Sequence, residues 1–443
     1  MALDTLSLLR SGKMAGAKRL DLSENLAGFP REIFELADSL EVLNLSKNQL
    51  SSLPSDFSLL TKLRILFCSE NNFRHLPAVL GECPDLSMIG FKSNQIETIE
   101  EGALPSQLRW LILTDNRIKR LPASIGGCRR LQKLMLSGNQ LEQLPEAMSS
   151  CMSLELIRLA ANRFSSLPQW LLELPKLAWL AIAGNPICAT LAHTSTEETF
   201  DWSNIELQAK IGEGASGIVH RARWQGGGGD RPVAVKVFKG AMTSDGLPSS
   251  ELAASLTVGR HENLMEVLGE ISDHPEGAPG LVMPLIDPAF SPLAGPPSFD
   301  SCTRDVYAEE LTFSLPVLSC LAKGVVSAAR HLHARNITHS DLYAHNILWN
   351  NNGDCLLGDF GAACGYPGTL SPALERIEVR AFGYLLEELL LRCASDVPSE
   401  HALWALQRRC IAPRVADRPL FVQIEEELSA CLPLEQRLHP ADF

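Results

Sequence analysis

The chain has 443 residues, of which 45% are hydrophobic and 21% charged, a composition that suits two or three folded domains with ordinary cores. Its formal net charge of −13 argues against nonspecific binding to nucleic acid or to anionic lipid, because neither attracts an acidic surface. The first residues lack the basic and apolar segments of a signal peptide, and no apolar run is long enough to cross a bilayer. We therefore expect a cytoplasmic protein with no nucleic-acid partner and no membrane span.

An internal repeat occupies the first part of the chain. Asparagines recur at intervals of 22 or 23 residues, and each closes the pattern Leu-x-x-Leu-x-Leu-x-x-Asn-x-Leu. They are Asn25, Asn48, Asn71, Asn94, Asn116, Asn139, Asn162 and Asn185. In such a repeat each unit supplies one short parallel strand and a return segment, and stacked units share a leucine core. We expect the asparagine amides to bond backbone groups that the turn after each strand leaves unpaired.

Two further features recur in phase with the asparagines. Leu-Pro pairs such as Leu76-Pro77 and Leu144-Pro145 fall at one phase of the repeat, where the proline is expected to open the return segment. Several of the 12 cysteines, such as Cys68, stand where other repeats place leucine. Since no cysteine spacing matches a zinc site, we expect small core residues rather than metal ligands or a disulfide framework.

From roughly Ala17 to Ile187 the chain resembles the leucine-rich repeat family, which implies an α/β solenoid of eight repeats. In that family the residues between the strand leucines face the concave surface, and here many of them are apolar. The sequence predicts a partner-binding surface there, formed by Phe67, Trp110, Ile112, Met135 and Trp179. The partner could be another protein or the second half of this chain. The alternative is a strand phase that is off by one, which would make these side chains core residues.

The repeat ends after Ile187, and a short polar stretch follows. From Ile205 the pattern changes to strands and then to long amphipathic helices, expected at 315–333 and 379–391. We therefore predict a repeat domain over residues 1–190, a linker over 191–202 and a second domain over 203–435.

A glycine-rich motif opens the second domain. Gly212, Gly214 and Gly217, followed by Val219, fit Gly-x-Gly-x-x-Gly-x-Val, in which small residues let backbone amides approach phosphates. A dinucleotide-binding fold begins with similar glycines, but there they open a helix, whereas a strand-like segment follows here. Lys236 ends the run Val-Ala-Val-Lys on the next strand, where its ammonium group can hold phosphates. This placement favours a nucleoside triphosphate site.

With these motifs, the segment from about Phe200 to Leu432 resembles the protein kinase family, which implies an α+β bilobal domain that uses ATP and Mg²⁺. The resemblance implies Asp341 as catalytic base, Lys236 as the lysine that contacts the α and β phosphates, and Glu251 as its carboxylate partner, with Glu262 as the second choice. It implies Asn346 and Asp359 as magnesium ligands. The remaining implied nucleotide contacts are Gly212, Gly214, Gly217, Val219, Ala234, Met283, Leu285 and Leu348. Arg418 is expected to pair with Glu375 in a structural role.

The chain departs from the kinase pattern at several positions. Ser340 replaces the arginine that usually precedes the catalytic aspartate, and Tyr343 replaces the lysine two residues after it. His345 could supply part of the missing positive charge, or it could be a loop histidine bonded to the backbone. The activation segment, from Asp359 to Glu375, is also very short.

Two classes of function follow. The first is an ATP-dependent protein kinase that phosphorylates a protein hydroxyl, with serine or threonine favoured over tyrosine, and whose repeats recruit a partner or substrate. The second is a nucleotide-binding pseudokinase that acts as an interaction scaffold. The presence of lysine, catalytic aspartate and both metal-ligand positions favours the enzyme, whereas the short activation segment favours the scaffold.

Overall fold

The computed structural model describes residues 5–189, 191, 198–214, 216–226, 229–240, 242–395 and 397–431. Half of the predicted linker (residues 192–197), residues 1–4 and 190 of the predicted repeat domain, and residues 432–435 at the end of the predicted second domain lie outside these residues. Contacts divide the chain into two compact units, Met1–Leu174 and Pro175–Phe443. The division falls before the strand of the eighth repeat, so the domain boundaries predicted at 190 and 203 remain a proposal.

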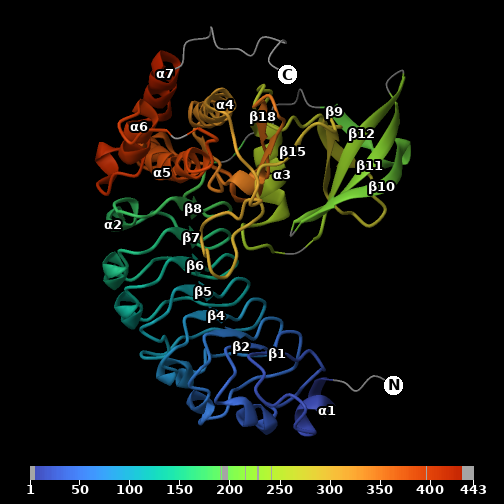
Figure 1. Ribbon diagram of the computed structural model, residues 1–443. Coiled ribbons are helices and arrows are strands. Elements are labelled where there is room, and N and C mark those ends of the chain that lie inside the picture. Colours follow the sequence, from blue (N-terminus) through green and yellow to red (C-terminus); the bar gives the residue numbers. More distant parts are fainter. Residues whose placement is uncertain are drawn as a thin grey trace. The chain divides into compact units, whose positions relative to one another are not determined.

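The first unit is a solenoid of short parallel strands and single helical turns (Figure 1). Its strands pair in chain order and are β1 (Arg19–Asp21), β2 (Val42–Asn44), β3 (Ile65–Phe67), β4 (Met88–Gly90), β5 (Trp110–Ile112), β6 (Lys133–Met135) and β7 (Leu156–Arg158). Its α-helices are α1 (Thr5–Arg10) and α2 (Gln169–Leu172), and its 3₁₀ turns are Arg31–Leu36, Phe57–Leu59, Ala78–Glu82, Ala123–Gly127 and Glu146–Ser150. The solenoid expected from the period is therefore confirmed.

The repeated asparagines hold successive turns together, as predicted. The side-chain amide of Asn139 donates to the carbonyls of Leu113 and Leu136, each at 2.9 Å, and its oxygen accepts from the Ile118 N–H at 3.0 Å. The residue before each of these asparagines from Asn48 onward has positive φ, which turns the chain out of the strand and leaves these groups without strand partners. One amide thus links two consecutive repeats.

The other two repeat features are also as expected. Pro77, Pro122 and Pro145 each immediately precede a 3₁₀ turn, and Pro168 immediately precedes helix α2. The cysteines in the described part of the chain are free thiols, and Cys68 is completely buried among the leucines. Burial raises the pKa of that thiol well above its ordinary value, so it packs as a small apolar residue.

The expected apolar surface between the strand leucines is only partly exposed. Phe67, Ile112 and Met135 are partly exposed, whereas Trp110 is 8% exposed with the Lys133 ammonium 4.3 Å from its ring centroid. Trp179 is 2% exposed and packs within the second unit. The predicted exposure is therefore wrong for both tryptophans.

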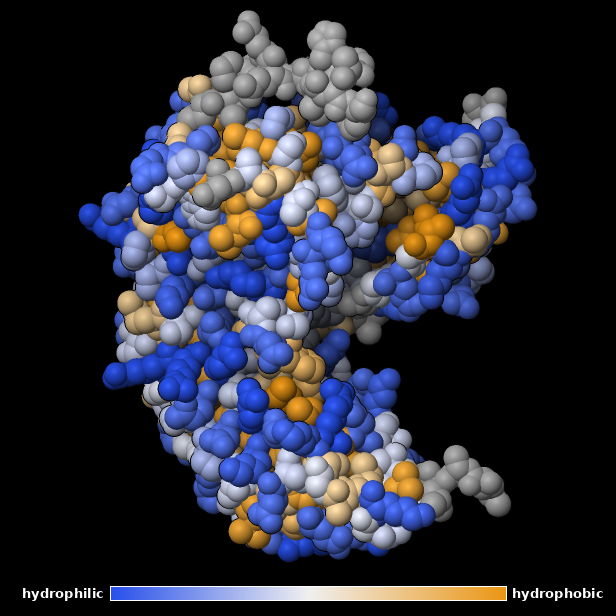
Figure 2. All heavy atoms as spheres, viewed as in Figure 1, coloured by the Kyte–Doolittle hydropathy of each residue, from blue (hydrophilic) through white to orange (hydrophobic). Residues whose placement is uncertain are grey.

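The second unit begins with β8 (Trp179–Ala181), the strand of the eighth repeat, and continues into a twisted sheet and a helical part (Figure 1). The sheet has the order β10-β11-β12-β14-β13-β9. Its strands are β9 (Glu198–Asp201), β10 (Ile205–Glu213), β11 (Gly217–Gly226), β12 (Gly229–Phe238), β13 (Gly269–Ser272) and β14 (Gly280–Pro284), and helix α3 (Pro248–Thr257) lies between β12 and β13 in the chain. Figure 2 shows hydrophobic side chains gathered at places on the surface of the second unit. Leu207 and Ile211 of β10 are exposed.

The helical part carries the remaining elements. They are α4 (Leu315–His333), α5 (Ser371–Leu390), α6 (Ala402–Cys410) and α7 (Phe421–Cys431), with the short strands β15 (Ser291–Pro292), β16 (Ile337–Thr338), β17 (Ile347–Trp349), β18 (Cys355–Leu357) and β19 (Cys364–Gly365). Short 3₁₀ turns lie here at Ala344–Asn346, Phe360–Ala362, Gly368–Leu370 and Val415–Asp417, and another, at Trp202–Asn204, lies between β9 and β10 of the sheet. Helix α4 has the predicted bounds, but α5 begins eight residues before the expected start at Val379, because Pro372 in its first turn favours a helix start there. No helix among the described residues combines the length and apolar character required to span a bilayer.

The asparagine ladder gives a stability test with a neighbouring control. Asn71→Ala should lower the free energy of unfolding by about 1–3 kcal/mol, because it leaves buried carbonyls of Leu45 and Cys68 and the Leu50 N–H without the amide. Asn72→Ala, one residue on and exposed, should change it by less than about 0.5 kcal/mol. Urea unfolding followed by circular dichroism measures both, and equal midpoints would contradict the structural role of the ladder.

Candidate functional site

A cavity of about 720 Å³ lies between the sheet and the helical part of the second unit. Most of the residues selected from the sequence line it, namely Gly212, Val219, Ala234, Lys236, Glu251, Met283, Leu285, Asn346, Leu348 and Asp359. Gly214, Gly217 and Asp341 are not among the lining residues. The cavity walls combine apolar side chains from both lobes with a few charged groups, which is the usual character of a small-ligand site.

The glycine-rich hairpin joins β10 to β11 above this cavity. The Gly214 N–H donates to the Gly217 carbonyl at 2.9 Å, and Gly212 pairs with Val219 across the hairpin. A Cβ atom at Gly217 would lie 2.7 Å from the Val237 carbonyl oxygen, so only glycine fits without a backbone shift. The close approach of the neighbouring strand explains this glycine independently of any ligand.

Lys236 of β12 and Glu251 of α3 form a close ion pair inside the cavity. The two side chains are 16% and 4% exposed, respectively, so water screens the pair only weakly. Burial raises the pKa of Glu251, the Lys236 ammonium opposes this, and the net shift is upward. Glu262, the second choice from the sequence, is exposed.

The segment 339–346, which carries Asp341 and Asn346 and matches the catalytic-loop motif of kinases, folds back on itself so that two of its polar side chains meet. Asp341 is 9% exposed, and the Asn346 amide donates to its main-chain carbonyl at 2.9 Å and to its carboxylate at 3.0 Å. Because the Asn346 nitrogen is used in this way, its amide oxygen is the atom that can face a cation. Asp359, which lies in the left-handed region with φ of 57°, lines the same cavity and accepts from the Gly361 N–H at 3.2 Å.

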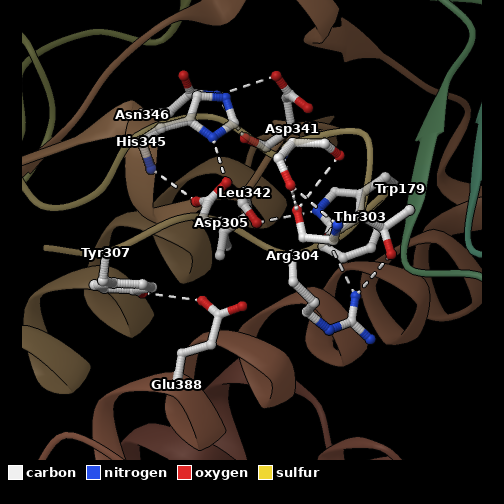
Figure 3. A network of polar contacts seen from close by, with 12 residues as sticks. Trp179, Thr303, Arg304, Asp305, Tyr307, Asp341, Leu342, His345, Asn346 and Glu388 are labelled. Carbon is white, nitrogen blue, oxygen red and sulfur yellow. Dashed lines mark hydrogen bonds and ion pairs between the residues drawn. The ribbon is translucent and has the colours of Figure 1, made fainter. Parts of the chain in front are cut away.

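Asp305 is a site residue that the sequence did not reveal. Its carboxylate, whose side chain is completely buried, accepts from the His345 main-chain N–H at 2.9 Å and lies 2.7 Å from the His345 Nδ1 (Figure 3). Burial lowers the pKa of His345, but the bond to Asp305 and the nearby Asp341 and Asp359 carboxylates outweigh this effect and raise it. His345 is therefore held by a carboxylate, and not only by the backbone, beside the cavity.

Glu378 of α5 is a second residue for which the sequence predicts no role. It is 2% exposed and accepts from the main-chain N–H groups of Ser340 at 2.6 Å and His339 at 3.3 Å. It also accepts from the Thr338 hydroxyl at 3.3 Å and lies 2.7 Å from the His333 Nε2. Burial raises the pKa of Glu378, yet the bond to His333 and the other donors leave it below its ordinary value. The only sequence signal was its place in Glu378-x-x-x-x-Gly383, where kinases carry aspartate.

The expected Arg418–Glu375 pair is wrong. The Arg418 guanidinium, which is 1% exposed, donates to main-chain carbonyls of Ala412, Arg376, Pro175 and Leu177. Glu375 instead accepts from the Phe421 N–H at 2.7 Å, at the start of α7. Two of the arginine's acceptors lie more than 240 positions away in the chain, beyond the reach of a local motif.

Comparison with known proteins agrees with this arrangement. The model of the protein kinase domain matches residues 205–427, about half of the chain. The chain belongs to the protein kinase family. Leucine-rich repeat models match residues 39–60 and the overlapping ranges 84–141, 106–164 and 129–187. Both resemblances identified from the sequence are thereby confirmed, as is the solenoid followed by a kinase domain.

Among curated proteins, similar relatives are serine/threonine-protein kinases. The chain is 29% identical over 201 residues to serine/threonine-protein kinase bur1 of Neurospora crassa, covering 42% of this chain and 34% of that protein. It is 30% identical to probable cyclin-dependent kinase 10 of Dictyostelium discoideum, covering 43% and 48%, and 28% identical to serine/threonine-protein kinase A-Raf of Mus musculus, covering 36% and 24%. The chain thus spans less than half the length of these relatives.

The cavity carboxylate can be tested by nucleotide binding. Asp359→Asn should weaken magnesium-dependent ATP binding by about 10- to 100-fold or more. Loss of a residue that only supports a metal ligand typically costs about that much, and here the ligand itself is changed. Asp354→Asn makes the same charge change five residues earlier at an exposed position and serves as the control. Calorimetric titration with ATP at several magnesium concentrations measures both variants. Equal affinity in Asp359→Asn and the unmodified protein would remove the metal assignment.

Proposed function

We propose that this protein is an ATP-dependent protein kinase that transfers the γ-phosphoryl group to a serine or threonine hydroxyl of a protein. One observation carries the proposal: a single cavity is lined by Lys236, Glu251, Asn346 and Asp359. Asp341 lies next to it, because Asn346 donates to its carboxylate. The family membership and the serine/threonine kinases among its relatives support the same reaction.

Each polar group has a distinct task in the proposed reaction. Lys236, oriented by Glu251, binds the α and β phosphates, and Asp341 accepts the proton of the attacking hydroxyl. Asn346 and Asp359 present oxygen atoms, which are the donors that Mg²⁺ prefers, so they fit the metal that the family uses. When bound, Mg²⁺ neutralises charge on the phosphates. Val219, Ala234 and Leu348 enclose the adenine, next to Met283 and the main chain at Leu285.

His345 fits the role of a supplementary phosphate contact. Tyr343, at the position where serine/threonine kinases carry a lysine, is only 5% exposed and its ring lies against Trp179 rather than in the cavity. His345 does line the cavity and is held in one orientation by Asp305 through two contacts. We include it in the site as a group that approaches the γ-phosphate, in place of the lysine.

The proposal extends to the repeats and to the location of the protein. The partly exposed Phe67, Ile112 and Met135 form an apolar surface on which a protein partner or substrate would dock, with Trp110 packed beside them. The cytoplasmic location rests on the sequence alone.

The second candidate function is a nucleotide-binding scaffold without transfer activity. It is favoured by the distance along the chain between Asp359 and the start of α5 at Ser371, which leaves room for only two 3₁₀ turns and the two-residue strand β19. A peptide substrate would find little surface on so short a segment.

Substitution of the proposed base separates these functions. Asp341→Asn should lower phosphoryl transfer by about 10²- to 10⁴-fold, because it removes a positioned proton acceptor. ATP affinity should change little, since the side chain does not line the cavity. Transfer of radiolabelled phosphate from ATP to a mixture of peptides measures the effect, with Asp354→Asn as the charge-matched control. If the unmodified protein transfers no more phosphate than Asp341→Asn, the scaffold is the correct reading.

A further inference from the structure

Trp179, the first residue of β8, makes two contacts with the catalytic loop, and Figure 3 shows the one with Leu342. Its indole N–H donates to the Leu342 carbonyl at 3.1 Å, and its ring stacks on Tyr343 with centroids 4.3 Å apart and planes 4° from parallel. Leu342 directly follows Asp341, the proposed base. A side chain from the eighth repeat therefore holds the peptide group next to the reacting carboxylate.

The surroundings of this tryptophan fix it from several sides. The Tyr384 ring of α5 lies 5.7 Å from the Trp179 ring, and the Arg304 guanidinium lies 3.4 Å from Tyr384 and 5.6 Å from Trp179. Trp179 is only 2% exposed as a result. The chain just before it is anchored as well, since Arg418 donates to the Pro175 carbonyl at 2.8 Å and to the Leu177 carbonyl at 3.4 Å.

The catalytic loop is thus held at three points by three different parts of the unit. Glu378 of α5 binds the Ser340 N–H, Trp179 of β8 binds the Leu342 carbonyl, and Asp305 binds His345. Two of these anchors come from the kinase domain, and the middle one, nearest Asp341 on its carboxyl side, comes from the last repeat. A general base must lie within hydrogen-bond reach of its proton, so a small shift of this peptide affects the transfer step directly.

We propose that Trp179 is a positioning residue for phosphoryl transfer, through which the last repeat sets the geometry of the catalytic loop. This inference rests on the proposed kinase function. It makes the eighth repeat a part of the catalytic structure, in addition to any recruitment by the other repeats. A tryptophan that merely completed the core of β8 would affect folding, but it would not affect turnover by folded molecules.

Steady-state kinetics of the full chain tests the proposal, with each preparation normalised to its ATP-binding sites by titration. Trp179→Ala should lower kcat by about 10²-fold, as expected for a displacement of about 1 Å at a reacting group, while KM for ATP stays within about twofold. Trp179→Phe keeps a ring against Tyr343 but lacks the N–H donor, so its kcat should lie between those of the unmodified protein and Trp179→Ala. Trp170→Phe, in α2 and outside the catalytic loop, should leave kcat unchanged.

A second substitution tests the contact from the other side, should Trp179→Ala fail to fold. Tyr343→Leu removes the stacking partner and leaves the repeat intact, and its kcat should fall with KM for ATP little changed. An unchanged normalised kcat in Trp179→Ala, or in Tyr343→Leu where Trp179→Ala does not fold, would overturn the inference while leaving the kinase function intact. An equal loss in Trp170→Phe would also overturn it. Absence of transfer by the unmodified protein would instead overturn the proposed function, and this inference with it.

Discussion

The helical part of the second unit depends on one set of contacts, the hydrogen bonds to the buried carboxylate of Glu378. A carboxylate removed from water is costly unless several donors replace its hydration. Here the main-chain N–H groups of His339 and Ser340, the Thr338 hydroxyl and the His333 ring all meet it. Because the donors come from β16, α4 and the start of the catalytic loop, a single charge fixes three segments together.

This arrangement explains why the loop can have Ser340, and not arginine, before Asp341. Ser340 has φ of 63°, a strained conformation for a residue with a Cβ, and its N–H points to Glu378 at 2.6 Å. This charge-assisted bond holds the Ser340 backbone without a positive side chain at that position. A phosphate on the activation segment would find no arginine there. The loop is instead fixed by contacts that are present in the unmodified chain.

The features that the sequence predicted are those that repeat locally or depend on short spacing. The asparagine ladder and the proline-led turns recur with a fixed period, so each site along the solenoid has the same backbone environment. Lys236 and Glu251 are 15 positions apart, and the strand and helix that carry them are both evident from the pattern. By contrast, Asp305 meets His345 across 40 positions and Trp179 meets Leu342 across 163. No periodicity or motif encodes such pairs, because they arise only when separate segments pack.

The same packing accounts for the exchange of roles between Tyr343 and His345. An aromatic residue at 343 gains a flat partner in Trp179, so its ring lies against the repeat and away from the cavity. His345, held by Asp305, is the residue of this pair that lines the cavity, where the proposed function places the nucleotide. The sequence predicts that His345 could supply part of the charge missing at position 343, but it gives no sign that Tyr343 packs on Trp179. The structure connects the two positions through the tryptophan.

The contacts of residues 175–179 also define where the catalytic unit begins. A fragment starting at the predicted boundary of 203 would lose the Pro175 and Leu177 carbonyls, which accept hydrogen bonds from Arg418. Of its four carbonyl acceptors, this almost completely buried arginine would keep only Ala412 and Arg376. The fragment would also lose Trp179, and with it the donor to the Leu342 carbonyl and the ring on Tyr343. Buried polar groups stripped of their partners are expensive, and exposed aromatic faces favour association. If the proposed function holds, the physical unit of catalysis therefore includes the last repeat, although the family model starts after it, at residue 205.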